Sequence, residues 1–111
     1  MANRPITIEG INPADNSLIL SDNGNTTANL GDTITWNIGN NSGVASITGI
    51  IDDSDIDIFS PDPSVQPNSS SWQGTVNPNL AVPTEEIYHI TYTRTGSDEI
   101  YKHDPKIQVN S

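Results

Sequence analysis

The sequence predicts an all-β fold, an antiparallel Greek-key β-sandwich of about seven to eight strands that forms one domain over residues 1–111. Short runs alternate apolar and polar residues, as in Ile34, Trp36 and Ile38 behind the Gly31-Asp32 turn, which is typical of half-buried strands. Turn residues separate these runs at a spacing of roughly 8–15 residues. No long window combines helical apolar spacing with caps and good helix formers, so we expect no long helix.

The first half of the chain predicts two hairpins. Ile6 and Ile8 mark a first strand, and the turn Asp22-Asn23-Gly24 is expected to pair Ser17–Ser21 with Thr26–Leu30, because this turn sequence favours two-residue hairpin loops. Thr33–Ile38 and Val44–Ile51 are expected to form the central hairpin through the Gly/Asn-rich loop between them.

The second half predicts a long crossover and then four more strands. Asp52–Pro67 carries three prolines, which cannot donate ladder hydrogen bonds and therefore indicate a loop or a sheet edge. The irregular link 77–83 has room for one helical turn. The expected strands are Ser69–Val76, Glu86–Arg94, Glu99–Lys102 and Lys106–Val109.

The alternation also predicts the core. With 32% hydrophobic residues, below the usual share for a globular protein, the core must depend on few side chains. The residues expected to form it are Ile34, Trp36, Ile38, Ile47, Tyr88, Ile90 and Tyr92.

Gly31–Trp36 resembles the strand pattern of cupredoxins and related immunoglobulin-like sandwiches, and the likeness extends to Ile87–Tyr92 and Lys106–Val109. A blue-copper site needs a Cys and two His, but this chain has no Cys and its only Met is Met1. Those proteins often place a His where this chain has Val44-Ala45-Ser46, and they place the Cys where it has Thr91 or Thr93, although His103 lies in a region that resembles their C-terminal ligand loop. The resemblance therefore implies the fold without its metal, and we expect no cofactor.

Charge and composition exclude several partners. The formal net charge of -10 repels a phosphate backbone and anionic membranes, so we expect neither nucleic-acid binding nor membrane insertion. No apolar run approaches 18 residues, and the N-terminus shows no apolar signal segment. The compartment stays open between cytoplasmic and exported.

The densest acidic cluster is the candidate metal site. Asp53, Asp55 and Asp57 have the spacing that opens an EF-hand loop, but Ile58 and Ser64 stand where that loop needs Gly and Glu. A calcium site of another kind is one interpretation. The other is an edge strand with carboxylates outward, which hinders aggregation between sheets.

His89 and His103 with Asp104 are a second possible ligand set, against ordinary surface histidines. Trp72 stands among Ser69, Ser70, Ser71 and Gln73, so it is either a second core plug or an exposed stacking platform assisted by Tyr101.

No hydrolase, zinc-protease or phosphate-loop motif is present. We therefore expect no enzyme, but a non-catalytic binding or interaction module whose partner is a protein or a carbohydrate. There are two alternatives. One is a carbohydrate-binding module in which Trp72, assisted by Tyr101 and the Asn-rich loops, stacks on a sugar ring, and the other is a self-assembling structural subunit.

Overall fold

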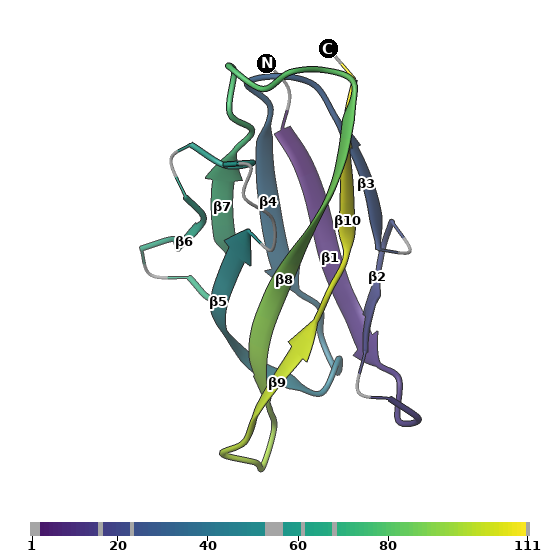
Figure 1. The fold of residues 1–111 in the computed structure, drawn as a ribbon. Coiled ribbons are helices and arrows are strands. Elements are labelled where there is room, and N and C mark those ends of the chain that lie inside the picture. Colours follow the sequence, from purple (N-terminus) through teal and green to yellow (C-terminus); the bar gives the residue numbers. More distant parts are fainter. Residues whose placement is uncertain are drawn as a thin grey trace.

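The computed structural model describes residues 3–15, 17–22, 24–52, 57–60, 62–67 and 69–110, which form strands and connecting turns without a helix. No helix of this part is long and apolar enough to cross a membrane. The strands, labelled in Figure 1, are β1 (Asn3–Ile11), β2 (Leu18–Leu20), β3 (Asn25–Ala28), β4 (Thr33–Ile38), β5 (Val44–Asp52), β6 (Ser64–Val65), β7 (Trp72–Thr75), β8 (Thr84–Arg94), β9 (Ile100–His103) and β10 (Lys106–Val109).

The prediction of an all-β fold is confirmed, but the strands form two mixed sheets. One has the order β2-β1-β4-β7-β6, and the other has the order β3-β10-β8-β5 with β9 also pairing β8. The β1–β4 and β3–β10 pairs are parallel, so the expectation of a purely antiparallel fold is wrong for them. Parallel neighbours need a crossover, and for β1 and β4 the intervening strands β2 and β3 supply it.

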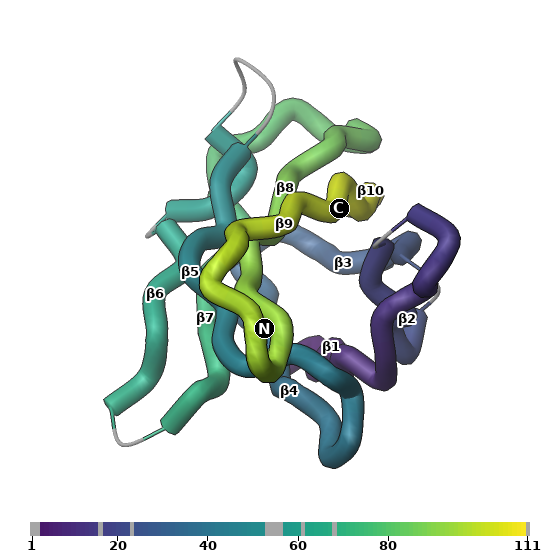
Figure 2. Tube along the Cα trace, turned by 90° about the horizontal axis from the view of Figure 1, so that it is seen from below, coloured from purple at the N-terminus to yellow at the C-terminus, as the bar shows by residue number. Residues whose placement is uncertain are grey.

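The predicted hairpin between Ser17–Ser21 and Thr26–Leu30 is wrong, because β2 pairs with β1 while β3 pairs with β10 in the other sheet. The turn residue Asp22 accepts hydrogen bonds from the backbone N–H of Gly24 at 3.0 Å and from the Thr26 hydroxyl. These hydrogen bonds stabilise the connection in which the chain passes from β2 in one sheet to β3 in the other. Figure 2 shows β2 and β3 on one side of the molecule and β5, β6 and β7 on the opposite side.

The predicted central hairpin of Thr33–Ile38 and Val44–Ile51 is also wrong, because β4 pairs with β1 and β7 whereas β5 pairs with β8. The loop between them starts at Gly39, whose N–H donates to the Ile8 carbonyl at 2.8 Å. A Cβ at Gly39 would lie 2.5 Å from that oxygen. The loop is therefore held against β1 and leads the chain to the second sheet.

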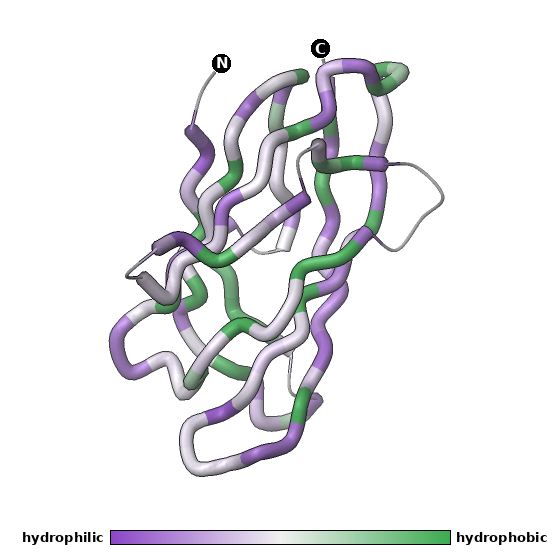
Figure 3. Tube along the Cα trace, turned by 90° about the vertical axis from the view of Figure 1, so that its left-hand side faces the viewer, coloured by the Kyte–Doolittle hydropathy of each residue, from purple (hydrophilic) through white to green (hydrophobic). Residues whose placement is uncertain are grey.

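The later strands follow the predicted alternation closely. Along β8, Tyr88, Ile90 and Tyr92 are fully buried, and β8 pairs antiparallel with the next strand, β9. Figure 3 shows how hydrophobic and hydrophilic positions alternate along the strands. The described part has ten strands, more than the predicted seven to eight, and β6 at a sheet edge is the strand that no predicted segment covers.

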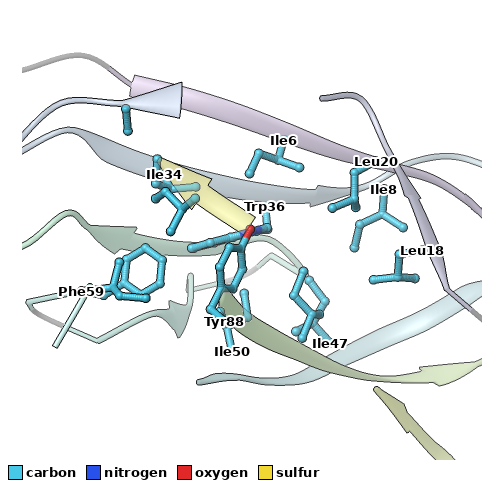
Figure 4. Packing of buried hydrophobic residues seen from close by; sticks show 14 of the residues in the cluster. Ile6, Ile8, Leu18, Leu20, Ile34, Trp36, Ile47, Ile50, Phe59 and Tyr88 are labelled. Carbon is cyan, nitrogen blue, oxygen red and sulfur yellow. The ribbon is translucent and has the colours of Figure 1, made fainter. Parts of the chain in front are cut away.

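Trp36 is the centre of the core, as its alternation predicts. Its ring makes edge-to-face contacts with Phe59 and Tyr88 at centroid distances of 5.5 and 5.9 Å, and its indole N–H donates to the Tyr88 hydroxyl at 3.2 Å (Figure 4). Burial raises the pKa of Tyr88, so its hydroxyl stays protonated. Six of the seven predicted core residues are buried, and the seventh, Ile38, is half-buried against them.

The turn before β4 is fixed by a buried acid. Asp32 is 3% exposed, and its carboxylate accepts hydrogen bonds from Arg4 Nε and from the backbone N–H of Asn29, both at 2.9 Å. Its backbone carbonyl accepts from Val76 N–H at 2.8 Å. Asp32 thereby connects β1, the start of β4 and the end of β7, which explains the Gly-Asp turn of the sequence pattern.

Candidate functional site

A pocket of about 480 Å³ lies where the end of β5 faces the β6–β7 side of the other sheet. This is the side opposite the β2–β3 step, where the chain passes between the sheets (Figure 2). The pocket is lined by Gly49, Ile50, Ile51, Asp52, Asp57, Asp62, Pro63 and Trp72.

Local sequence explains how the two walls are placed. In β5 the buried Ile50 and the half-buried Asp52 share one face, while Ile51 between them is 53% exposed. On the other wall, the buried Pro63 lies against Gly74 of β7, where a Cβ would come within 2.9 Å of the proline ring. A glycine in β7 therefore allows the segment before β6 to pack closely, and this packing brings Asp62 to the pocket.

Three carboxylates meet in this pocket. Oxygen atoms of Asp52, Asp57 and Asp62 lie within 4.8 Å of one another, although the three residues come from β5 and from two places in the segment after it. Asp52 is half-buried, and the other two are exposed. Like charges at this distance repel one another, since little solvent separates them.

Asp52 shows the effect of that environment. Burial raises its pKa to about 6, with a further increase from the charges of Asp57 and Asp62, while a hydrogen bond from the backbone N–H of Ile58 acts in the opposite direction. That bond, 3.1 Å long, reaches Oδ2. The buried Oδ1 has no hydrogen-bond partner among the described residues. Asp52 therefore changes charge at a pH well above that of an ordinary aspartate.

Trp72 forms the aromatic wall of the pocket. It lies directly opposite Trp36 in the β4–β7 pair, and cross-strand partners share one face of a sheet. Trp72 is half-buried and packs against the edge of the core. The structure thus combines the two interpretations left open by the sequence, since the ring contacts the core and also borders open space.

The structure does not bring Tyr101 to Trp72. Tyr101 stacks on Tyr92 with a centroid distance of 5.7 Å, the guanidinium of Arg94 lies 5.7 Å from its ring centre, and its hydroxyl donates to Glu99 at 3.1 Å. Tyr101 does not line the pocket. Its aromatic ring belongs to the β8–β9 hairpin.

Of the predicted metal ligands, Asp57 lies in the carboxylate cluster, whereas Asp53 and Asp55 lie outside the described residues. Ile58 is completely buried, so the side chain after Asp57 belongs to the core. Asp52 and Asp62 are the cluster residues that the predicted ligand set lacked. Asp62 is ten residues beyond Asp52, so the sequence gives no sign that the two carboxylates meet. The inward position of Asp52 could have been predicted, because it lies two residues after the buried Ile50 in the same strand.

The two histidines lie apart. His103 pairs with the inward-facing Ile90, whereas His89, next to Ile90 in β8, belongs to the opposite face. Burial lowers the pKa of His103, against a smaller opposite effect of Asp104 and Asp15. Among the described residues its Nε2 is buried without a hydrogen-bond partner. The alternative ligand set of His89, His103 and Asp104 is not brought together.

The chain matches no protein-family model and no curated protein.

Proposed function

We propose that this protein is a non-catalytic binding module whose ligand site is the pocket beside Trp72. The observation that carries the proposal is the meeting of one aromatic wall and three converging carboxylates in a pocket of about 480 Å³. Ligand pockets have volumes of roughly 300–1,000 Å³, with apolar walls and a few polar groups that orient the ligand. In this pocket Trp72, Ile51 and Pro63 supply apolar surface, and the carboxylates supply hydrogen-bond acceptors.

The arrangement of nucleophiles and bases supports a function without catalysis. The hydroxyls of Ser46 and Ser71 hydrogen-bond to Thr93 and Asn37, respectively. A serine nucleophile needs an adjacent base, whereas the partners of these two hydroxyls are a second hydroxyl and an amide. The pKa of Asp52 is raised to about 6, which suits a general base, so hydrolysis that is abolished by Asp52→Asn would overturn the proposal.

A carbohydrate is the second candidate ligand class, because a half-buried indole at the border of a pocket matches the way in which sugars stack on aromatic rings. Carboxylates at the same pocket would accept hydrogen bonds from sugar hydroxyls. Because Tyr101 lies in the β8–β9 hairpin, this version of the site depends on Trp72 alone for stacking.

We further propose that the two sheets make a Greek-key sandwich of the cupredoxin-like or immunoglobulin-like kind without copper ligands. Support comes from the hydrophobic cluster that the described strands of both sheets share and from Trp36 at its centre. The chain has no Cys, so added copper should give no intense blue thiolate absorption. Appearance of that absorption would contradict this part of the proposal.

A binding panel tests the proposed function. Soluble neutral oligosaccharides and short peptides are screened against the wild type, Trp72→Ala and the control Tyr101→Phe. Removal of a stacking aromatic ring costs roughly 1–3 kcal/mol of binding energy by analogy with bases stacked on aromatic side chains. We therefore expect Trp72→Ala to lose binding while Tyr101→Phe keeps it, and unchanged binding by Trp72→Ala would refute the site.

A further inference from the structure

Among the described residues, no strand pairs with the outer edge of β5 next to this pocket. β5 is the last strand of its sheet, and the described residues pair it only with β8. Its register with β8 is interrupted between Val44 and Ser46 and again between Ile47 and Gly49, but it is regular from Gly49 to Asp52. Irregular edges hinder the addition of a strand, whereas a regular edge offers free backbone groups to an extended peptide.

The regular part of this edge is also the part that lines the pocket, with Pro63 and Trp72 on the opposite wall. Successive side chains of an added strand point to opposite faces. Every second side chain of a peptide paired with Gly49–Asp52 would therefore point between the two sheets, toward Trp72.

Charge decides which side chain fits there. The pocket contains three carboxylates, and no Lys, Arg or His is among its lining residues. An ammonium or guanidinium group would relieve the repulsion between the carboxylates, form charge-assisted hydrogen bonds and interact with the face of the indole. A neutral sugar would leave the repulsion in place, and a second copy of a chain with net charge -10 would add to it.

We propose that this pocket receives the lysine or arginine side chain of an extended peptide segment that pairs with the β5 edge at Gly49–Asp52. The inference rests on the proposed function, because it names the ligand class of the same site. The negative net charge also favours encounter with a basic partner, through an attraction that salt screens.

The test compares two blocked five-residue peptides of alternating threonine and valine, one with a central lysine and one in which that lysine is acetylated. Acetylation removes the charge and leaves the backbone unchanged. Titration into ¹⁵N-labelled protein should shift the backbone amide signals of Gly49 and Ile51 and the indole signal of Trp72. We expect the acetylated peptide to bind at least about tenfold more weakly, and high salt to weaken the lysine peptide.

Variants of the protein give a second, independent comparison. Asp57→Asn with Asp62→Asn should weaken the lysine peptide by a similar factor, whereas Asp98→Asn, an exposed acid beyond the far end of β8, should leave its affinity unchanged. Equal loss in both proteins would mean that net charge alone attracts the peptide, and this result would overturn the inference.

Other outcomes separate the inference from the proposed function. Equal affinity for both peptides refutes the cationic ligand. If only neutral oligosaccharides shift the Trp72 indole signal, the inference is wrong and the binding module stands. If the molecular mass in solution increases with protein concentration, a second copy of the chain occupies the β5 edge, and the inference is wrong. If no member of either ligand class shifts the indole signal, both proposals fail.

Discussion

Replacing Asp52 with asparagine should stabilise the protein at pH 8. The pKa of the Asp52 carboxyl is raised from 3.8 to about 6, mainly by burial. The folded state is therefore less stable when this carboxyl is charged. The asparagine side chain would remove that charge and keep an oxygen to accept the 3.1 Å bond from Ile58 N–H. The change in stability measures how strongly burial and the neighbouring carboxylates disfavour the charged form of Asp52.

The expected magnitude follows from the pKa. Each pH unit of difference corresponds to about 1.4 kcal/mol, so the two pKa values of Asp52 correspond to about 3 kcal/mol if solvent screening is neglected. Because Asp57 and Asp62 are exposed and Asp52 is only half-buried, screening reduces the effect, and we expect a gain of about 1 kcal/mol.

The pH dependence has a definite sign. Because the pKa of Asp52 is raised in the folded state, its contribution to the free energy of unfolding is fully present below pH 3.8. This stabilisation is lost as the pH rises through about 6. Urea unfolding of wild type and Asp52→Asn should therefore give equal stabilities near pH 3.5 and a difference that grows up to pH 7. Asp98→Asn is the control. A variant that is less stable at pH 8, or a difference independent of pH, would refute the reasoning.

Three further substitutions test the fold around the site. Tyr88→Phe leaves the buried indole N–H of Trp36 without its acceptor, so chemical denaturation should show a loss of about 1–3 kcal/mol; an unchanged midpoint would contradict this hydrogen bond. Burial lowers the pKa of His103, so the contribution of its neutral form to folding stability is complete above pH 6.5 and decreases at lower pH. His103→Gln should flatten the stability profile below pH 6.5, and a parallel profile would argue against burial. Gly74→Ala places a Cβ 2.9 Å from the Pro63 ring and should cost about 1–3 kcal/mol, while a neutral effect would mean that the two walls pack loosely.

The sequence predicts strands better than it predicts their partners. Alternation identifies the inner face of β8 and of β4 because burial acts on each side chain locally. Pairing depends on where the chain goes after a turn, and both Asp22-Asn23-Gly24 and the loop after Ile38 lead to the other sheet. Turn chemistry alone does not distinguish a hairpin from such a step.

The candidate site was only partly accessible from the sequence for the same reason. Trp72 is distinguished by its polar neighbours, and Asp57 by the acidic spacing around it. Asp62 joins Asp52 only because Pro63 packs on Gly74 of another strand. Such a contact between distant residues leaves no periodic pattern in the sequence.

The central claim is that ligands bind beside Trp72, and the two indole N–H signals test it most directly. The chain has two tryptophans, so Trp72→Phe assigns both signals in a ¹H–¹⁵N spectrum. Each ligand that binds in the panel should shift the indole signal of Trp72 and leave the signal of the buried Trp36 unchanged. Saturating binding with both signals unmoved would place the ligand elsewhere and contradict the account.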